Sequence, residues 1–389
     1  MTSDSSRPFG GRVLIAYNVP KREQRGRDID YLSEAGVLDE VHAVRDALFE
    51  QGYEVAITGI QRSVPVFMDR VMRFRPQAIF NLVEGWQGES QYEMHFPSIY
   101  ELLGIPYTGA PPWTLATALN KWHTKCLLRQ AKLPAPGGML CSEVPGRCNL
   151  RYPVIVKPAQ EDASLGVDFD AVVDNLADLR RRVAWVVQTY HQPALVEEYI
   201  DGRELNVAVL GDQFPAALPI SEITFDMLPE HLPKICTYNA KWMSGSQDDR
   251  WTDAQCPALL GDETTRRVQS IATSAFRVLG CRDYARVDMR LSKDHQPYIL
   301  EVNPNPDISP EAGLARSARA SGRTYTQLIG EVVGLALQRG NHEPYGRSHP
   351  ERVFRGPALA PRRSVEPRAH FAADASLSRN GSAVRVGAD

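Results

Sequence analysis

Two segments near the carboxyl end of the chain, RVDMRL and YILEVNP, carry the residues best suited to catalysis. Side chains alternate between the two faces of a strand, so Asp288 shares a face with Arg286 and Arg290, and Glu301 shares a face with Asn303. If the two strands pair, two carboxylates, an amide and a guanidinium converge on one patch of sheet. Such hard oxygen donors suit Mg²⁺ or Mn²⁺ bound to nucleotide phosphates, and an adjacent arginine stabilises a transferring phosphate.

The residues predicted on the opposite faces of these two segments are apolar. These apolar residues are Val287, Met289, Leu291, Leu300 and Val302. Alternating carboxylates on a strand, taken alone, usually indicate a solvated sheet face. The hypothesis of a magnesium site therefore depends on what accompanies the cluster.

Hydrophobic periodicity predicts the elements that position this cluster. DYARVDMRLS and PYILEVNP are typical of two strands, and TTRRVQSIATSAFRVLG before them predicts an amphipathic helix. Further upstream, YPVIVKP predicts a strand that follows a helix containing LNKWHTKCLLRQ. LVEEYIDGRELNVAVLG is interpreted as two strands joined by a tight turn at Asp201 and Gly202, which is a typical hairpin signal.

The amino-terminal part of the chain alternates between strand and helix patterns. RVLIAY, YEVAITGI and AIFNLVEG predict strands, while DEVHAVRDALFEQG and VFMDRVMRFRP predict the helices between them. This order predicts a parallel sheet with helices on both faces, so the chain is expected to be an α/β protein with a doubly wound amino-terminal domain. The change of pattern after IPYTGAPPW places a domain boundary near Pro112.

Composition narrows the class of function. The 389 residues are 43% hydrophobic, enough to bury the cores of several compact domains. A net charge of -3 gives no electrostatic reason to expect nucleic acid or a membrane surface as a partner, so small-molecule substrates are expected. The six cysteines show no zinc-ligand spacing. No apolar run matches a signal peptide or the ~20 residues that cross a bilayer, so the protein is expected in the cytoplasm.

Four segments occur in an order that resembles the ATP-grasp fold, and most closely its D-alanine–D-alanine ligase family. They are VKPAQEDASLGV, VEEYIDGREL, YNAKW and the pair RVDMRL and EVNPNP, supported by LGIPYTG and LNKWHTK. The resemblance, which covers residues 12–335, implies an amino-terminal parallel α/β domain over 1–112 and two α+β subdomains, 113–210 and 211–340, that sandwich ATP. The Pro- and Arg-rich tail, 341–389, is expected to be disordered.

The resemblance implies a phosphate site built on lysines. Lys157 on its strand and Lys121 at the start of the central subdomain would bind nucleotide phosphates, and the loop from Glu161 to Gly166, with Ser164 in it, would fold over them. A lysine on a rigid strand acts as a point charge, and a loop of small residues brings backbone N–H groups close to phosphate.

In VEEYIDGREL the same resemblance implies the contacts with the nucleoside. Glu197 would accept a hydrogen bond from the adenine amino group, and the backbone of Tyr199 and Ile200 would read the edge of the ring. Glu204 would hold the ribose hydroxyls. A carboxylate suits a cis-diol because it offers acceptors to two donors.

The resemblance also implies the catalytic groups and cofactors. Lys241 would approach the terminal phosphate from a mobile loop, and Arg286 would stabilise an acyl phosphate and the tetrahedral intermediate that follows. Asp288 and Glu301 would bind one divalent ion, and Glu301 would bridge to a second ion that Asn303 also holds. The implied cofactors are ATP and two Mg²⁺ or Mn²⁺ ions, and related ligases are commonly homodimers.

Two loops depart from the family pattern. Ala163 stands where the ligases carry a serine, and Trp242 stands where they carry a tyrosine. The glutamate that completes their hydrogen-bond network is left open among Glu34, Ala35 and Glu40. An alanine side chain forms no hydrogen bond and an indole accepts none, so the network is expected to be absent as a unit.

The segment NPNPDISPEAGLARSA departs in the place where the family binds a substrate carboxylate. Asp307, Ala312 and Gly313 stand where the ligases have a glycine and a serine–leucine pair. An aspartate repels a carboxylate unless the acceptor presents an amine, a hydroxyl or a metal there. The acceptor site is therefore expected to be altered, and the substrates are expected to be other than two D-alanines.

Three classes of function follow from these residues. The first is a ligase that joins a small-molecule carboxylate to an amine through an acyl phosphate and releases ADP and phosphate, with a genuine D-alanine–D-alanine ligase of cell-wall synthesis as its close alternative. The second is an ATP-grasp phosphotransferase, in which a hydroxyl takes the phosphate. The third is a non-catalytic nucleotide-binding protein.

Overall fold

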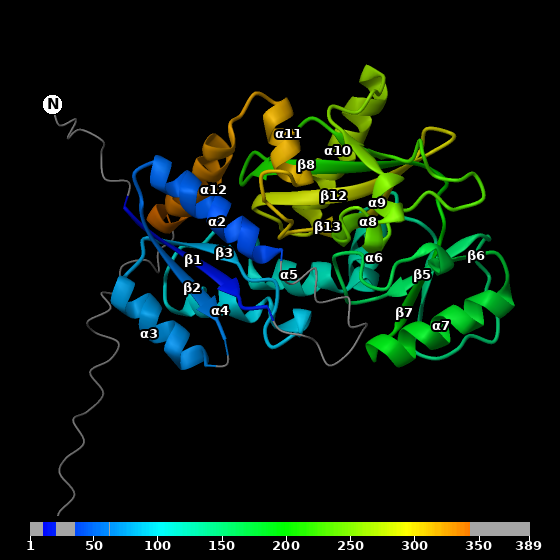
Figure 1. The fold of residues 1–389 in the computed structure, drawn as a ribbon, viewed down its shortest axis with the longest axis horizontal. Coiled ribbons are helices and arrows are strands. Elements are labelled where there is room, and N and C mark those ends of the chain that lie inside the picture. The colour runs from blue at the N-terminus through cyan, green and yellow to red at the C-terminus, as the bar shows by residue number, and fades with distance from the viewer. Residues whose placement is uncertain (1–10, 21–35, 62, 343–389) are drawn as a thin grey trace, which may run out of the picture. The chain divides into compact units, whose positions relative to one another are not determined.

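The computed structural model describes residues 11–20, 36–61 and 63–342, which contain three β-sheets and the helices around them (Figure 1). None of the helices in these ranges is long and apolar enough to cross a membrane. The predicted tail from residue 343 onward lies outside the described residues, as do Glu34 and Ala35.

The amino-terminal sheet is parallel, with the strand order β2-β1-β3. Its elements are β1 (Arg12–Asn18), β2 (Glu54–Ile60), β3 (Ala78–Leu82), α2 (Val37–Glu50), α3 (Val64–Phe74) and α4 (His95–Leu102). Val13 and Ile15 pack in one core with α2, whereas Leu14 and Ala16 pack in another with α3 and α4. Both faces of the sheet are therefore covered by helices, and the predicted parallel α/β arrangement is confirmed.

The central sheet has the order β4-β7-β5-β6 with antiparallel neighbours. Its elements are β4 (Gly138–Cys141), β5 (Val154–Pro158), β6 (Val172–Val173), β7 (Ala194–Glu198) and α7 (Leu176–Tyr190), and they follow α5 (Pro112–Leu119) and α6 (Lys121–Gln130). Val154, Val156 and Val196 form a core with α7, which covers one face of this sheet.

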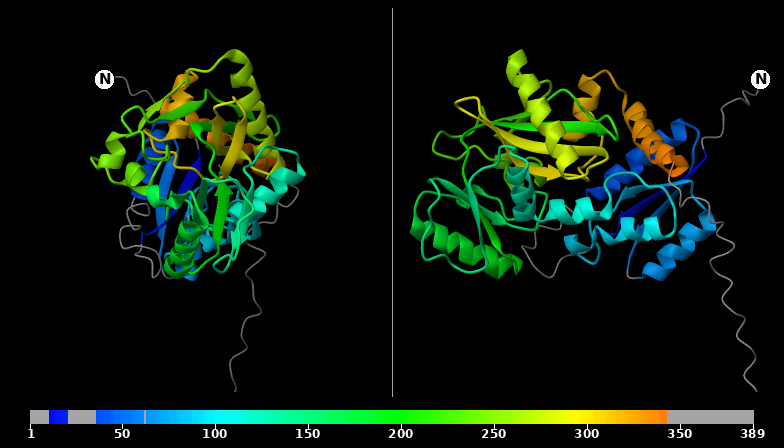
Figure 2. Two further views of the ribbon diagram at one scale, coloured as in Figure 1. Left: turned by 90° about the vertical axis from the view of Figure 1, so that its right-hand side faces the viewer. Right: turned by 180° about the vertical axis from the view of Figure 1, so that it is seen from behind.

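The largest sheet has six strands in the order β11-β10-β8-β12-β13, with β9 paired to β8. The strands are β8 (Gly202–Gly211), β9 (Ala216–Ala217), β10 (Ser221–Thr224), β11 (Asp253–Gln255), β12 (Asp283–Ser292) and β13 (Pro297–Asn303). The accompanying helices are α8 (Tyr238–Trp242), α9 (Gln247–Arg250), α10 (Asp262–Val278), α11 (Gly313–Ala320) and α12 (Tyr325–His342). Val287, Met289 and Leu291 are buried in one core with residues of α10. Figure 2 shows this helix lying over the yellow strands of the sheet.

The predicted hairpin around Asp201 and Gly202 is wrong, because β7 and β8 belong to different sheets. β7 pairs with β4 and β5, and β8 pairs with β10 and β12, so neither strand has an edge left for the other. Position 202 favours glycine for a different reason. A Cβ on Gly202, whose φ is 152°, would collide with the carbonyl oxygen of Leu291. Glycine marks a close backbone approach here, where β8 begins against β12.

The prediction that Leu300 lies on the face opposite to Glu301 is also wrong, since Leu300 and Glu301 both line the central cavity. Asp288 pairs with Glu301 but Met289 pairs with Ile299, so Leu300 is an extra residue on β13. A β-bulge of this kind breaks the strict alternation of faces and leaves the extra residue unpaired. Val302, beyond the bulge, is buried in the core.

Candidate active site

A cavity of about 450 Å³ lies between the central sheet and the six-stranded sheet. All of the predicted site residues except Asn303 line it. The lining members of that set are Lys121, Lys157, Glu161, Ser164, Glu197, Tyr199, Ile200, Glu204, Lys241, Arg286, Asp288 and Glu301. Residues from segments far apart in the sequence are thus brought to one place, and the role of each remains a prediction.

Lys121 lies at the start of α6 and links the phosphate loop to the metal-ligand candidates. Its ammonium group is 2.9 Å from Asp162 Oδ1 and 3.4 Å from Glu301 Oε2, and it also donates to the backbone carbonyl of Glu161. Burial would lower the pKa of Lys121, but the two carboxylates outweigh burial and raise it above its ordinary value. Lys121 is therefore a fixed positive charge in the cavity wall.

The phosphate loop is anchored through the side chain of Glu161. Gln192 Nε2 donates to Glu161 Oε1 at 2.7 Å, and the hydroxyl of Ser90 donates to Glu161 Oε2 at 3.4 Å. Glu161 is buried, whereas the neighbouring Ser164 is partly exposed. The glutamate thus holds the base of the loop, and Ser164 is left near its tip beside the cavity.

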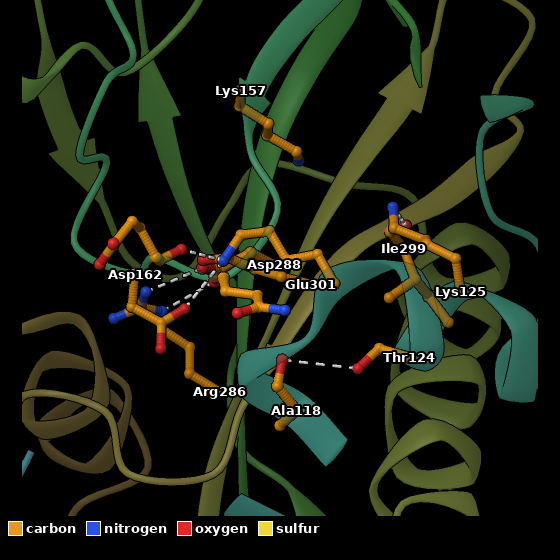
Figure 3. Close-up of polar contacts among 12 residues, drawn as sticks. Ala118, Thr124, Lys125, Lys157, Asp162, Arg286, Asp288, Ile299 and Glu301 are labelled. Atoms are coloured by element: carbon orange, nitrogen blue, oxygen red, sulfur yellow. Dashed lines mark hydrogen bonds and ion pairs between the residues drawn. The ribbon is translucent and has the colours of Figure 1, made fainter. Parts of the chain in front are cut away.

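A buried charge cluster joins α6 to the central sheet. Lys125 Nζ lies 2.7 Å from Glu197 Oε1, and Lys157 Nζ lies 2.9 Å from Glu197 Oε2. Lys125 also donates to the backbone carbonyl of Ile299 at 2.9 Å (Figure 3). Burial raises the pKa of Glu197, but the two ammonium groups outweigh burial and hold it below its ordinary value. The carboxylate that was predicted to meet adenine is engaged by two lysines here.

Burial shifts the pKa of Lys125, the helix lysine of this cluster, in the opposite direction from that of Glu197. It lowers the pKa of Lys125 to about 8, although the attraction of Glu197 opposes the shift. Lys157, a second positive charge nearby, lowers it further. Lys125 is therefore the lysine of the site whose protonation is most sensitive to a mildly alkaline pH.

The predicted nucleoside end of the cavity follows the crossing between β7 and β8. Tyr199 donates its hydroxyl to the backbone carbonyl of Lys234 at 3.2 Å. Glu204 lies 3.6 Å from the guanidinium of Arg290, which is almost fully buried and packs near the ring of Tyr199. Burial raises the pKa of Glu204, and Arg290 partly offsets that rise. Arg290 thus fixes the carboxylate that was predicted to hold a ribose.

Two side chains donate hydrogen bonds to Asp288, one from the same strand and one from the adjacent strand. Arg286 Nε and Nη2 donate to its two carboxylate oxygens at 2.7 Å and 2.8 Å, and Asn206 Nδ2 donates to Oδ1 at 2.7 Å. Strand pairing places Asp288 opposite Asn206 on one side and opposite Glu301 on the other. Three adjacent strands therefore present one polar row to the cavity (Figure 3).

The donor set of this row fits a hard divalent cation. Burial would raise the pKa of Glu301, but Lys121, Lys157 and other cations outweigh burial and hold it far below its ordinary value, so the carboxylate is ionised at neutral pH. Asn303 lies opposite Arg286 in the strand pairing, and its amide oxygen accepts a hydrogen bond from the Asn305 amide at 2.9 Å. Two carboxylates and one amide are oxygen donors that Mg²⁺ accepts.

A metal cage made of side chains alone is not found in the part of the chain that the structure describes. Within residues 11–20, 36–61 and 63–342, no group of three or more His, Cys, Asp or Glu side chains is arranged to hold an ion.

Helix α8 carries Lys241 to the rim of the cavity. Thr237 caps its start: the hydroxyl accepts from the Ala240 amide at 3.1 Å and donates to Asp248 at 2.6 Å. The ammonium of Lys241 lies 5.2 Å from the centre of the Trp242 ring. Trp242 Nε1 donates to the backbone carbonyl of Ala163 at 2.8 Å, so the two loops are joined although the family's side-chain network is absent.

The predicted acceptor end of the cavity is lined by Asp307, Glu311, Ala312, Gly313 and Arg316. Asp307 Oδ1 accepts from the Ser309 amide at 2.8 Å. The guanidinium of Arg316 donates to the Ser221 hydroxyl at 3.3 Å and to the Glu311 carbonyl at 3.0 Å. Both signs of charge therefore meet at this end.

Glu40 lies behind Asp307. One of its oxygens accepts from the Ile308 amide at 3.4 Å. Burial and the nearby carboxylate of Asp307 raise the pKa of Glu40 well above its ordinary value. Among the three positions left open for the family's glutamate, Glu40 is the one within the described residues, and it contacts the acceptor segment.

Sequence reasoning missed two residues that the site uses. Lys125 lies one helical turn after Lys121, so the spacing within LNKWHTK places both lysines on one face of α6. Asn206 lies two residues after Glu204 on β8, so strand alternation places both on the cavity face. The spacing rules that were applied to β12 and β13 would have found both residues.

Comparisons with known proteins agree with this geometry. The family model described as "D-ala D-ala ligase C-terminus" matches residues 138–334. An uncharacterized protein of Sinorhizobium fredii, y4sG, is 36% identical over 75% of this chain and 86% of its own length. The D-alanine–D-alanine ligase of Alcanivorax borkumensis is 35% identical over 62% of this chain and 72% of its own. That of Desulforudis audaxviator is 32% identical over 76% and 92%, respectively.

Solved structures show the same arrangement of elements. The D-alanine–D-alanine ligase of Bacillus anthracis complexed with ATP aligns with a TM-score of 0.67 and 19% identity, over 85% of this chain and 99% of that one. A second structure of the Bacillus anthracis ligase aligns with a TM-score of 0.65 and 22% identity, over 85% and 98%.

Proposed function

Because this chain belongs to the D-alanine–D-alanine ligase family, we propose that it is an ATP-dependent ligase that joins a small-molecule carboxylate to an amine. Its fold is the ATP-grasp fold predicted from the sequence, as the likeness to the Bacillus anthracis ligase and the order of the sheets confirm. The boundaries between its domains stay a prediction.

One observation carries the proposal. The cavity between the two antiparallel sheets gathers Lys121, Lys157, Arg286, Asp288 and Glu301 within reach of one another. Three cations suit the phosphates of a nucleotide, and the two carboxylates suit the metal ion that accompanies them. An isolated solvated sheet face would not be expected to enclose these groups in a cavity.

The proposed reaction has two steps. A carboxylate oxygen of the first substrate attacks the γ-phosphorus of ATP, and ADP leaves with the electrons of the broken P–O bond. The amine nitrogen of the second substrate then attacks the acyl carbon, loses a proton and expels inorganic phosphate. Arg286 and Lys241 would stabilise the negative charge that develops on the phosphate oxygens. Closure of the loops over this site would exclude the water that hydrolyses an acyl phosphate.

The divalent ions of this reaction would be held by Asp288 and Glu301, with Asn303 as a further oxygen donor. A bound Mg²⁺ would neutralise phosphate charge and orient the transferring group. In the described structure the same carboxylates are balanced by Arg286 and Lys121, so the site is preformed for positive charge. Two ions remain the expectation from the family resemblance.

We further propose that the amine substrate is not D-alanine, because Asp307, Ala312 and Gly313 differ from the family's carboxylate-binding residues. The identity to ligases named for D-alanine favours the second candidate, a genuine D-alanine–D-alanine ligase.

A screen of ADP release tests these proposals. The full chain would be incubated with ATP, Mg²⁺ and pairs of amino acids and amines, with hydroxylamine added in a parallel series. A ligase is expected to release ADP only with the correct carboxylate, and hydroxylamine should trap that carboxylate as a hydroxamate. Release of ADP with D-alanine alone would favour the second candidate. A stable phosphorylated product without hydroxamate would show a phosphotransferase instead, and absence of turnover with any pair would favour a non-catalytic protein.

A further inference from the structure

The segment that carries Lys241 touches the phosphate loop at two separate points. Trp242 Nε1 donates to the backbone carbonyl of Ala163 at 2.8 Å, and the Tyr238 amide donates to the backbone carbonyl of Val167 at 2.9 Å. The apolar sides of both segments share a small core with Leu165. The loop and α8 are therefore packed as one unit in this structure.

The phosphate loop needs such a partner because of its backbone. Ala163 and Ser164 have φ values of 56° and 60°, in the left-handed region that residues other than glycine rarely adopt. A residue held there persists when its surroundings compensate the strain. The hydrogen bond from Trp242 is a contact made directly to the carbonyl of the first of these two residues.

The same indole also contacts Lys241. The ammonium group lies 5.2 Å from the centre of the ring, a distance at which the negative face of an indole attracts a cation. Lysine is long and flexible, so its head group is ordered only when a neighbour holds it. Trp242 therefore uses two parts of one side chain: the N–H edge contacts the phosphate loop, and the face contacts the lysine.

We propose that Trp242 is a positioning residue that fastens α8 to the phosphate loop and sets Lys241 relative to the bound nucleotide. The inference rests on the proposed ATP-dependent reaction. The hydrogen bond from Trp242 to a backbone carbonyl would take the place of the side-chain network that the resemblance implies for the family. An alanine at position 163 is compatible with this link, since the acceptor is a main-chain oxygen.

Two substitutions separate the two contacts. Trp242→Phe keeps an aromatic face for Lys241 but removes the N–H donor, and Trp242→Leu removes both. Loss of one hydrogen bond at a loop is expected to lower kcat about fivefold to tenfold, and loss of both contacts should lower it by roughly tenfold more. Because the residue acts through loop closure, kcat should fall more than the KM for ATP rises. Trp113→Phe, at a tryptophan 77% exposed on α5, is the matched control and should leave kcat unchanged.

A proteolysis measurement keeps the test independent of the amine substrate. Trypsin cleaves after Arg250, the last residue of α9, the helix that follows α8, and cleavage there can be followed by mass spectrometry with and without ATP and Mg²⁺. The wild-type chain should be protected by the nucleotide, and Trp242→Phe should lose most of that protection at an unchanged melting temperature. If the phenylalanine variant unfolds, a benzothienyl analogue of tryptophan at position 242 removes the N–H at nearly constant shape and takes its place.

Equal kcat and equal protection in wild type and Trp242→Phe would overturn the positioning role while leaving the proposed ligase intact. No protection of the wild-type chain by ATP and Mg²⁺ would overturn both this inference and the nucleotide assignment. Reduced protection in Trp242→Phe with unchanged protection in Trp113→Phe would support the inference.

Discussion

The charged side chains at the two ends of the cavity have different kinds of partner. At the predicted nucleotide end several charged groups have a close partner of opposite sign: Glu197 lies between Lys125 and Lys157, and Asp288 is held by Arg286. At the acceptor end the carboxylate of Asp307 is bound to a backbone amide, and Arg316 donates to a hydroxyl and a carbonyl.

This difference indicates which end is general and which is specific. A binding site for a shared cosubstrate can be completed by ion pairs that hold its lysines in place before the nucleotide arrives. A site for a particular acceptor must leave polar groups for that molecule to satisfy, and those groups decide which substrates are rejected. By the resemblance, the predicted nucleotide end keeps the family's residues, and we propose that this chain differs from the family at the predicted acceptor end.

The largest effect on the rate of ADP release is expected from replacing Glu301, a predicted metal ligand. Glu301→Ala should lower the rate of ADP release on the order of 10³-fold, because it removes a carboxylate from the proposed ion and leaves Lys121 without one of its two partners. The rate is measured with saturating ATP over a range of Mg²⁺ concentrations. Glu263→Ala, at an exposed position in the first turn of α10, is the control. Wild-type turnover in Glu301→Ala would discredit the metal assignment.

The buried lysine cluster gives the next largest effect, and it appears as a dependence of stability on pH. Lys125 has a pKa of about 8 in the folded chain against 10.5 for an ordinary lysine. Between these values the unfolded chain binds more protons than the folded one, so stability from this group rises with pH. The free energy of unfolding of wild type, relative to Lys125→Met, should increase by about 3 kcal/mol between pH 8 and pH 10.5.

Urea unfolding of both proteins across this range measures the difference, and other titrating groups cancel in the subtraction. The sign is the decisive outcome. A difference that stays flat or falls with rising pH would mean that Lys125 keeps its proton throughout, held by Glu197 alone. Lys132→Met, at an exposed lysine just after α6, should show no such difference.

The acceptor end can be changed toward the family pattern. A variant with Asp307→Gly, Ala312→Ser and Gly313→Leu should gain D-alanine-dependent ADP release by about tenfold, because a repelling carboxylate is removed and a carboxylate-binding pair is introduced. A Cβ at Gly313 would lie 3.9 Å from Arg286 Cδ, an ordinary contact distance, so the backbone there accepts a residue other than glycine.

The KM for ATP serves as the internal control of this exchange, because none of the three positions is among the residues predicted to bind the nucleotide. It should change by less than about twofold. A gain in D-alanine turnover with unchanged ATP affinity would sharpen the contrast between the two ends. An unchanged preference among amines would show that the acceptor is selected elsewhere in the cavity.

Which site residues could be predicted from the sequence depends on whether they act through a regular side-chain pattern. Asp288, Glu301 and Lys157 lie on strands whose alternation is legible in the sequence, so their convergence on one cavity could be predicted. Trp242 contacts a main-chain oxygen, and no side-chain pattern signals such a bond. Its partner residue, Ala163, had been considered only for what its side chain lacks.

Two wrong predictions about the fold share one cause, which is the pairing of strands that lie far apart in the sequence. The turn signal at Gly202 is real, but the competing partners of β7 and β8 lie far away in the sequence and decide that no hairpin forms. The bulge at Leu300 likewise depends on how β13 registers with β12. A periodicity of two residues cannot show where an extra residue is inserted.

The smallest effect tests whether the nucleotide end depends on local helix capping. Asn120 caps α6, the helix of Lys121 and Lys125, by accepting from the His123 amide at 3.1 Å. Asn175 caps α7 in the same way, accepting from the Ala177 and Asp178 amides at 3.0 Å and 3.1 Å. Replacing either asparagine by alanine should lower the free energy of unfolding by about 1 kcal/mol.

Only Asn120→Ala should also affect the nucleotide, since α6 positions the lysines while α7 covers the far face of the central sheet. We expect its KM for ATP to rise roughly threefold, a part of the lost capping energy, and that of Asn175→Ala to stay unchanged. Urea unfolding and steady-state ADP release measure the two quantities on the same preparations. If both variants raise the KM equally, the nucleotide end responds to global stability, and its ion pairs do not hold the lysines independently of the rest of the fold.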